Sequence, residues 1–438
     1  MQLEKCNAYV VRDEKVIAPA SHLSYFPLVV QSVKGATITD VDGNQFIDFL
    51  SSASSLNLGS LHERVISAVQ EQLERYTQYT VAYTYNPETI AYAEALTGVY
   101  PGGVPAKICF GNCGSDANDA AVKFSRAYTR RSKVIVFHQG YHGSTYGSMS
   151  MSTVTTRMSR HMGPLLSEIY PFPFCGPNDD PKAALKPMLD AFATYLPADE
   201  VACMVIEPVQ GDSGIVPAHP EFIQGLYDLC QEHGILFIAE EVQQAFGRTG
   251  KWFSIEHYGI VPDGIIMGKS IGAGFTLGAF MAKSEIIDAL PAPAHLFTLG
   301  GNALACTAGL AQFKFMQEDN FFGEVDQKGE MLKAFFQEMK DTYGIVGEIR
   351  GYGLSIGVDI INKETGEGDS TAAAKISYRC YEKGMIMITL GGNVLRIQPP
   401  LIISEEEIAK SISIWREVFA ELVNGEIPDS VLENSKGW

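Results

Sequence analysis

Short apolar runs recur through the middle of this chain and alternate with longer stretches in which apolar residues return at helical spacing. Nearly continuous apolar runs between turn residues are typical of strands that are buried on both faces. Such strands, separated by helices, predict an α/β fold built on a mostly parallel sheet. We expect strands at residues 107–110, 133–137, 203–206, 235–239, 264–267 and 277–282.

The two ends of the chain follow different patterns. Residues 36–49 predict a β-hairpin that turns at Asp42-Gly43-Asn44. Toward the C-terminus helices alternate with strands, and Ser404 and Glu407 form a capping box that opens a final helix. In this part of the chain we expect strands at residues 353–361, 385–389 and 394–397. These patterns predict an N-terminal segment (1–60) that joins a small α+β domain (325–438), with a large domain (61–324) between them.

Composition describes an ordinary globular protein. Hydrophobic residues make up 46% and charged residues 19% of the 438 positions, which is enough for large cores. A net charge of -18 argues against nucleic acids and anionic membranes as partners. No apolar run approaches a membrane span, and the N-terminus lacks a secretion signal. Eight scattered cysteines without a CxxC pair complete the prediction of a cytoplasmic protein.

Two charged residues stand where strands are expected to end. Lys269 follows the apolar run 264–268 and precedes a glycine-rich turn, and Glu240 closes the run 235–239. A lysine held out of water favours its neutral, nucleophilic form. Because ligands collect at the carboxyl ends of parallel strands, this lysine and this acid predict the two poles of a cofactor site.

Two further motifs follow strand ends. Gly114 and Ser115 open a helix, whose N–H groups and hydroxyl suit a phosphate, although an ordinary capped helix would have the same pattern. Tyr141 lies between glycines and could lie flat against a planar ring. An arginine in an apolar strand, Arg396, needs an anion, which is either a ligand carboxylate or a structural salt-bridge partner.

Nucleotide motifs are incomplete in this chain. Residues 268–270 resemble the tail of a Walker loop, but Asp263 stands where that motif requires glycine. Residues 272–274 lack the third glycine of a dinucleotide fingerprint. ATP and NAD are therefore weak candidates.

No metal site is expected. His138 and His142 have no carboxylate or cysteine at metal spacing, and structural histidines are the simpler interpretation. Cys109 and Cys113 lack a second pair, so zinc is disfavoured as well.

Taken together, the motifs resemble the class III aminotransferase family of fold-type I pyridoxal-phosphate enzymes, in order and over nearly the whole chain. The resemblance implies a large domain with a mostly parallel seven-stranded sheet and a smaller α+β domain. It also implies a homodimer or a dimer of dimers whose active sites are shared between subunits. The matching residues are 42–44, 114–115, 141–143, 206–211, 241–243, 246–250, 268–270, 298, 301–302, 395–396 and 399–400.

The resemblance implies roles around the cofactor, pyridoxal 5'-phosphate. Lys269 would bind its aldehyde covalently. Gly114 and Ser115 would bind its phosphate, joined by Thr298 of the partner subunit. Tyr141 would stack on its ring.

Two more roles concern the polar atoms of the ring. Gln243 would contact the phenolic oxygen. Glu240 would pair with the ring nitrogen, at a position where the family usually has aspartate. The negative charge is retained, but an additional methylene group must be accommodated.

Within the family the chain looks closest to the racemase branch, the isoleucine 2-epimerases and the aminocaprolactam racemase. Asp212 is the most informative position, because the family's aminotransferases mostly carry glutamate there and its racemases carry aspartate. The other matching segments are residues 110–119, 141–148, 293–298 and 436–438.

Asp212 has a chemical reason to be present in a racemase. Reactions of this family begin when the α-proton of the substrate passes to Lys269. A racemase must return a proton to Cα from the opposite face, so a second acid or base helps, and we assign this role to Asp212. The simpler alternative is a loop residue that hydrogen-bonds its neighbours.

Arg396 matches the family arginine that binds the α-carboxylate, so the expected substrate is a free amino acid and not a lactam. Tyr25, with other apolar residues predicted near the entrance (Phe26, Leu56 and Leu58), suggests an aliphatic, isoleucine-like side chain, although core packing explains such residues equally well.

The alternative function is a 4-aminobutyrate or ω-amino-acid aminotransferase that uses 2-oxoglutarate. Glu207 would then act as the family's switch residue, masking an arginine for one substrate and releasing it for the other. A non-catalytic protein on the same fold is disfavoured because Lys269, Gln243 and Arg396 are all present.

Overall fold

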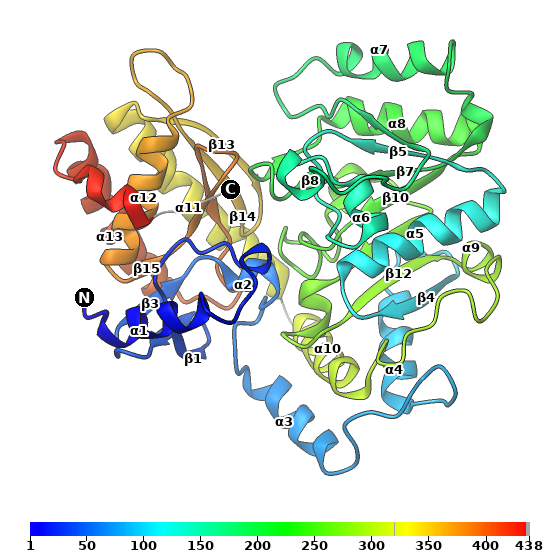
Figure 1. Cartoon of the computed structure of the whole chain (residues 1–438), viewed down its shortest axis with the longest axis horizontal. Coiled ribbons are helices and arrows are strands. Elements are labelled where there is room, and N and C mark those ends of the chain that lie inside the picture. Colours follow the sequence, from blue (N-terminus) through cyan, green and yellow to red (C-terminus); the bar gives the residue numbers. More distant parts are fainter. Residues whose placement is uncertain (319, 435–438) are drawn as a thin grey trace. The chain divides into compact units, whose positions relative to one another are not determined.

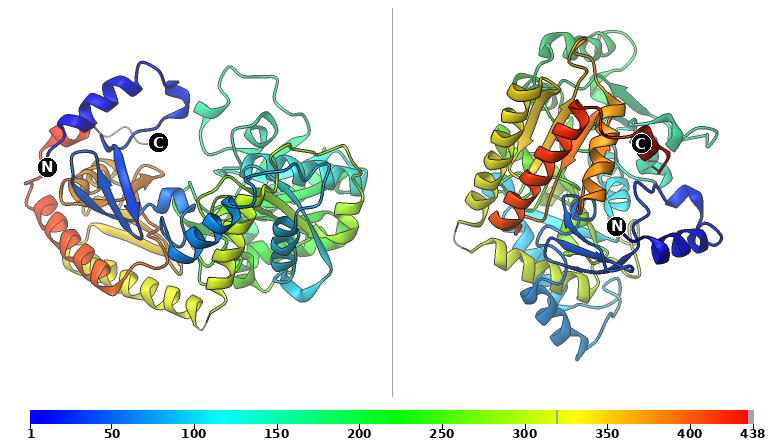
Figure 2. Two further views of the ribbon diagram at one scale, coloured as in Figure 1. Left: turned by 90° about the horizontal axis from the view of Figure 1, so that it is seen from below. Right: turned by 90° about the vertical axis from the view of Figure 1, so that its left-hand side faces the viewer.

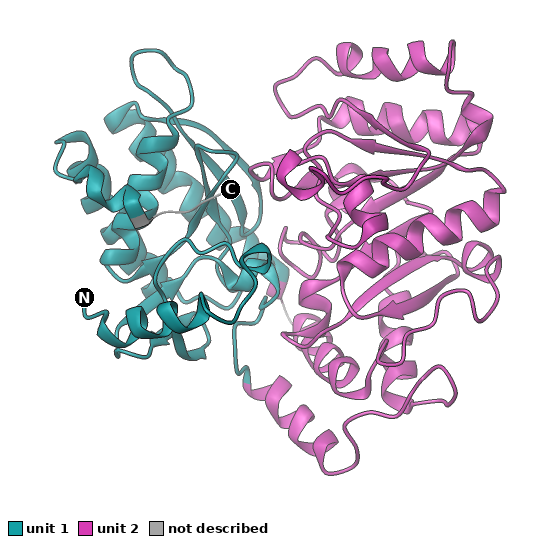
Figure 3. Ribbon diagram, in the orientation of Figure 1, with its two compact units in different colours: residues 1–62, 322–438 teal, residues 63–321 magenta. Residues whose placement is uncertain are grey.

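A computed structural model of the chain describes residues 1–318 and 320–434. It contains two compact units, residues 1–62 with 322–438 (unit 1) and residues 63–321 (unit 2), shown in Figures 1 and 3. Residues 436–438, which contribute to the resemblance, lie outside the described part. Among the described residues, no helix has the length and apolar character needed to cross a membrane.

A seven-stranded sheet forms the centre of unit 2. Its order is β4-β12-β11-β10-β7-β5-β6. Strand β12 runs antiparallel to β4 and β11, and the other neighbouring strands are parallel, which confirms the predicted mostly parallel sheet. The strands are β4 (Ala106–Gly111), β5 (Lys133–Phe137), β6 (Ile169–Phe172), β7 (Val201–Ile206), β10 (Leu236–Glu240), β11 (Gly264–Met267) and β12 (Gly278–Lys283).

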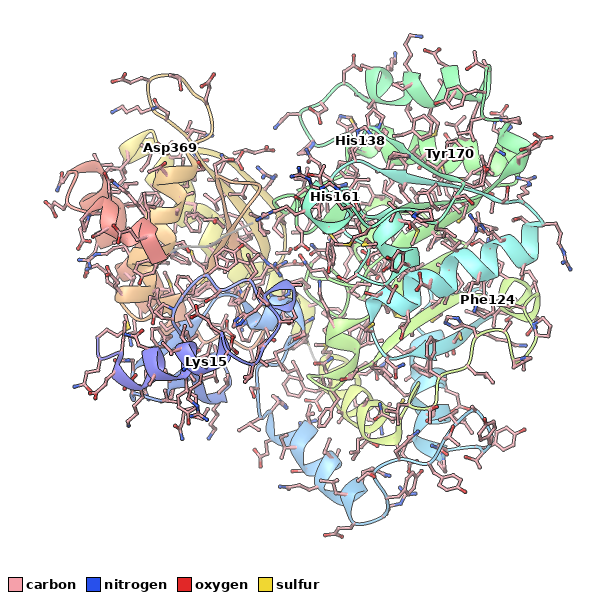
Figure 4. The ribbon with its side chains drawn as sticks, viewed as in Figure 1. Lys15, Phe124, His138, His161, Tyr170 and Asp369 are labelled. Atoms are coloured by element: carbon pink, nitrogen blue, oxygen red, sulfur yellow. The ribbon has the colours of Figure 1, made fainter. Side chains whose placement is uncertain are left out.

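Helices cover both faces of this sheet, as the apolar runs predict (Figures 1 and 2). On β10, Leu236 and Ile238 belong to the same core as α5 (Gly114–Thr129). The intervening Phe237 faces the other way and packs its ring edge-on against Tyr227 of α8 (Pro220–His233). Because side chains alternate along a strand, α5 and α8 lie on opposite faces. Phe124 of α5, marked in Figure 4, is part of the α5-side core.

The edge strand β6 is the one member of this sheet that the apolar pattern did not reveal. Three of its four residues are at least partly exposed, and one of these is Pro171, which is compatible with an edge but not with the centre of a sheet. The remaining α-helices of unit 2 are α3 (Glu63–Leu73), α4 (Pro87–Thr97), α6 (Tyr146–Met151), α7 (Pro181–Phe192), α9 (Ser284–Asp288) and α10 (Ala303–Met316), and its remaining strands, β8 (Val209–Gln210) and β9 (Val216–Pro217), form a small hairpin.

Unit 1 joins the two ends of the chain in one sheet. The predicted hairpin is present as β2 and β3, with Gly43 at a φ of +91° in its turn. Strand β15 pairs parallel with β3. The strands of this sheet, in spatial order, are β1 (Val30–Lys34), β2 (Thr37–Asp40), β3 (Gln45–Asp48) and β15 (Met385–Ile386). Helix α1 (Glu4–Asp13) precedes β1 along the chain, and α2 (Ser51–Ser54) follows β3.

The second sheet of unit 1 has the order β13-β14-β17-β16. Two predicted strands were wrong in detail: Gly353 lies in the β13–β14 turn with a φ of +51°, and the run 385–389 is divided between β15 and β16. The capping box at Ser404 and Glu407 is confirmed. The elements are α11 (Phe321–Tyr343), β13 (Val346–Tyr352), β14 (Ser355–Ile360), α12 (Ser370–Glu382), β16 (Ile388–Leu390), β17 (Val394–Ile397) and α13 (Glu405–Val423).

Candidate active site

Lys269 directly follows Gly268 at the end of β11 and is half-buried. Its φ of +48° is unusual for a residue with a side chain, and such conformations persist where surrounding structure enforces them. A Cβ atom on Gly268 would lie 3.0 Å from the Cα of Gly114. The lysine turn therefore packs directly on the predicted phosphate turn.

Ser115, Gly114 and Gly143 form a cradle of tightly packed backbone. Ser115 Oγ accepts a hydrogen bond from the N–H of Ser144 at 3.1 Å. A Cβ atom on Gly143 would lie 2.2 Å from that oxygen, and one on Gly114 would lie 2.7 Å from the side chain of Val242. Because no side chain fits at these positions, backbone N–H groups at the start of α5 can approach an anion closely.

Glu240 ends β10 and is only 3% exposed. Burial, followed by the charge of Glu207, raises the pKa of Glu240 well above its usual value, while Lys269 and a hydrogen bond from Asn118 act in the opposite direction. Asn118 itself lies on α5 and donates from Nδ2 to the carbonyl of Gly114 at 3.0 Å. Asn118 thus connects the predicted phosphate turn at Gly114 to the carboxyl group of Glu240, a role that was not predicted from the sequence.

Glu207 follows β7 and binds two backbone segments at once. One carboxylate oxygen accepts the N–H of Tyr141 and the other accepts the N–H of Gly211, both at 2.9 Å. Burial raises the pKa of Glu207 to about 7, against the effect of these two bonds; the charge of Asp212 raises it further and that of Lys269 lowers it. Glu207 therefore holds the predicted ring-stacking tyrosine and the turn that carries Asp212.

His142 lies beside these acids. One ligand atom each of His142, Glu207 and Glu240 lies within 4.8 Å of the others, and all three residues are buried. These acids come from other strand ends, so they do not stand at metal spacing from His142 along the chain. Burial lowers the pKa of His142 to about 4, so the ring is neutral near pH 7. His138, marked in Figure 4, instead accepts a hydrogen bond from Gln210 on its carbonyl.

Asp212 and Gln243 are in direct contact. Gln243 Nε2 donates to Asp212 Oδ1 at 3.3 Å. A Cβ atom on Gly211 would lie 2.3 Å from Gln243 Oε1, so the amide packs closely on the turn before Asp212. Gln243, predicted to contact the cofactor's phenolic oxygen, thus also positions the proposed second base.

The predicted substrate residues Arg396 and Tyr25 belong to unit 1. Arg396 lies on β17, is 2% exposed, and donates from Nε to Gln398 Oε1 at 2.5 Å. Tyr25 donates its hydroxyl proton to the carbonyl of Thr389 at 3.1 Å. Thr389 lies on β16, which pairs with β17, so Tyr25 contacts the strand next to the one that carries Arg396.

Thr298 lies on an exposed loop of unit 2, where its carbonyl accepts a hydrogen bond from Gln78 at 3.0 Å. Exposure is required of a residue that serves a second copy of the chain. Its role at the partner's phosphate stays a prediction.

The residues of unit 2 fit a phosphorylated, planar cofactor that carries an aldehyde. The glycine cradle can receive a phosphate, Tyr141 can face a ring, and Lys269 offers an amine. Glu240 is a buried acid that can meet a ring nitrogen. The fold and the site together are those of a fold-type I enzyme that uses pyridoxal phosphate.

Comparisons with known proteins identify the family of fold-type I enzymes to which the chain belongs. Residues 18–419 match the model of the family described as aminotransferase class-III. The isoleucine 2-epimerase of Lentilactobacillus buchneri is 38% identical, over the whole of both chains. The leucine/methionine racemase of Thermococcus litoralis is 36% identical, over 98% of this chain and 99% of its own. The chain belongs to the class III aminotransferase family.

Similar proteins also include aminotransferases. Several relatives that are 31% to 35% identical carry that name. A solved aminotransferase of Bacillus anthracis superposes with a TM-score of 0.87 and 28% identity, covering 96% of this chain and all of its own. Proteins named as aminotransferases and proteins named as racemases or epimerases are therefore both among the relatives of this chain, and the racemases and epimerases represent the predicted branch.

Proposed function

We propose that this enzyme is a pyridoxal-phosphate-dependent racemase or 2-epimerase of free aliphatic amino acids. Pyridoxal 5'-phosphate is the cofactor. The observation that carries the proposal is Asp212, which Gln243 holds in the same polar cluster as Lys269. The full-length similarity to an isoleucine 2-epimerase supports it further.

Two residues would move the proton. When bound, the cofactor withdraws electrons from Cα and acidifies its C–H bond. In one direction, Lys269 Nζ takes this proton and a carboxyl proton of Asp212 reaches Cα from the other face; in the reverse direction their roles exchange. Gln243 keeps Asp212 oriented, and Glu207 holds the turn below it.

Substrate binding would use unit 1. Arg396 can bind the α-carboxylate with two parallel hydrogen bonds, and Tyr25 contributes to the side-chain pocket. In this proposal Glu207 has a positioning role in place of the switch role, because its two carboxylate oxygens hold the backbone of Tyr141 and Gly211.

The second candidate is an aminotransferase of the 4-aminobutyrate type, which similar proteins of that name support. Such an enzyme returns the proton to the cofactor and needs an oxo acid to complete its cycle. Asp212 would then have no obligatory part in proton transfer.

A single assay separates the two candidates. The purified holoenzyme is incubated with L-isoleucine without any oxo acid, and the amino acids are resolved by chiral chromatography. We expect D-allo-isoleucine to form, and parallel incubations with leucine, valine and alanine define the side-chain preference. Glutamate formation that depends on added 2-oxoglutarate, without D-allo-isoleucine, would favour the aminotransferase instead.

A further inference from the structure

Two buried glutamates from neighbouring parallel strands meet at the floor of the site. Glu207 follows β7 and Glu240 ends β10, and these strands pair directly. Carboxylate oxygens of the two residues lie within 4.8 Å of each other, with His142 at the same distance or less. Such proximity in a buried place strongly disfavours two negative charges.

The groups around this pair do not remove the conflict. Lys269 lowers the pKa of both carboxyls, but Asp212 raises the pKa of Glu207 and Glu241 raises the pKa of Glu240. His142 is neutral, since burial lowers its pKa to about 4. The described surroundings are therefore more negative than positive, so the pair needs a proton.

The two members of the pair differ in their hydrogen bonds. Glu207 accepts two backbone N–H groups, which favour its ionised form. Glu240 interacts with the amide of Asn118. We propose that Glu207 and Glu240 hold one proton between them, with Glu207 as the carboxylate and Glu240 as the acid, and that Glu207 thereby keeps the ring nitrogen of the cofactor protonated.

The proton has a defined place before and after the cofactor binds. When no cofactor is bound, the proton resides on a carboxyl oxygen of Glu240. With the cofactor bound, this proton would reside on the ring nitrogen and Glu240 would be the carboxylate. The pair would then carry two negative charges beside one positive ring nitrogen, and the total charge of the site would be unchanged. Glu207, which stays ionised behind Glu240, raises the proton affinity of the combined site through its charge. Glu207 is therefore a positioning residue: it does not touch the ring, and its charge favours the protonated form of the ring nitrogen.

Glu241 provides a matched control next to Glu240. It is equally buried, and burial also raises its pKa to about 7. Its carboxylate, however, accepts hydrogen bonds from the Ser254 hydroxyl and the Ile255 N–H. Its replacement by glutamine removes a buried acid whose charge acts on Glu240 less strongly than that of Glu207 does.

The test measures the ring nitrogen directly. Holoenzyme is prepared with pyridoxal phosphate labelled with ¹⁵N in the ring, and the ¹⁵N chemical shift is followed against pH. We expect Glu207→Gln to lower the midpoint of ring deprotonation by at least about one pH unit, a tenfold loss of proton affinity. Glu207→Asp, which keeps the charge, should stay close to the wild type, and Glu241→Gln should shift the midpoint less than Glu207→Gln does. An unchanged midpoint in Glu207→Gln, or an equal shift in Glu241→Gln, overturns the proposal.

A second measurement covers the case in which Glu207→Gln fails to bind cofactor. Infrared spectra of the full-length protein freed of cofactor should contain the C=O stretch of a protonated carboxylic acid at about pH 8. That band should vanish in Glu240→Gln and persist in Glu241→Gln; its persistence in Glu240→Gln contradicts the proposal. The inference rests on the cofactor site of the proposed function. Because neither readout depends on the fate of the α-proton, its failure is distinct from failure of the racemase assignment.

Discussion

The strand ends of unit 2 and strand β17 of unit 1 both bury charge, but in opposite ways. In unit 2, Glu207 and Glu240 lie together near one lysine, Lys269. In unit 1, Arg396 is a buried positive group whose Nε donates a hydrogen bond to Gln398 Oε1. The first arrangement suits proton transfer and the second suits an anionic substrate group. Changes in the two regions should therefore affect different steps.

The largest effect should follow from Lys269→Ala. Removing both the covalent anchor and the first base should lower racemisation by on the order of 10⁴-fold or more. The absorbance of the bound cofactor should change as well, because its aldehyde loses its amine partner. Lys107→Ala, which removes an exposed ion pair with Asp288, is the control and should behave like the wild type. Racemisation within tenfold of the wild type in Lys269→Ala would refute the assignment of this base.

Asp212→Asn should separate proton removal from proton return. We expect racemisation to fall by on the order of 10² to 10⁴-fold, whereas cofactor affinity changes only severalfold. Exchange of the α-hydrogen of one enantiomer with deuterated solvent should survive, because Lys269 still acts on its face. The exposed Asp199→Asn is the matched control. Equal loss of exchange for both enantiomers would mean that Asp212 has no face-specific role.

Arg396→Lys tests the other side of the comparison. Lysine keeps the charge but loses the planar fork, so KM for the amino acid should rise by about tenfold to a hundredfold with a much smaller change in kcat. Arg350→Lys is the control, because Arg350 lies on β13 of the same sheet and pairs with Asp359. A fall in kcat without any change in KM would contradict a substrate-binding role.

Glu241→Gln should change how stability depends on pH. Burial raises the pKa of Glu241 to about 7 in the folded protein, so the folded state binds more protons than the unfolded state between about pH 4.5 and 7. Stability from this group is present at low pH and lost as pH rises through that window. Relative to the wild type, the variant should gain on the order of 2 kcal/mol of unfolding free energy between about pH 5 and 8. Denaturant titrations at the two pH values measure this, and parallel curves would disprove it.

The smallest effect is expected for Tyr25→Phe. The variant loses one neutral hydrogen bond to the Thr389 carbonyl, worth about 1 kcal/mol, so KM should rise a few-fold and kcat should stay unchanged. Steady-state kinetics with L-isoleucine check this. Tyr9→Phe, an exposed position on α1, serves as the control. A loss of kcat as large as in Asp212→Asn would place Tyr25 in the chemistry instead of the pocket.

The central sheet was predictable because its strands are buried on both faces. Continuous apolar runs such as 133–137 and 264–267 coincide with β5 and β11. The edge strand β6 was not predicted, because it is partly exposed and contains proline. Gly353 was assigned to a strand because its flanking residues are apolar, although its positive φ places it in a turn.

The candidate site was predictable to the extent that motifs mark strand ends. Lys269, Ser115 and Glu240 could be named because each closes or opens a regular element. The meeting of His142 with Glu207 could not be predicted, since it depends on which strands are neighbours and not on spacing along the chain. The bond between Gln243 and Asp212 was hidden for the same reason.

The central claim is that the α-proton leaves one face of Cα and another returns to the opposite face. The most direct measurement incubates the wild-type holoenzyme with L-isoleucine in deuterated water, without an oxo acid, and analyses the product by chiral chromatography and mass spectrometry. We expect D-allo-isoleucine that carries one deuterium at Cα. Failure to form D-allo-isoleucine, with amino-group transfer appearing only when an oxo acid is added, would contradict the central claim.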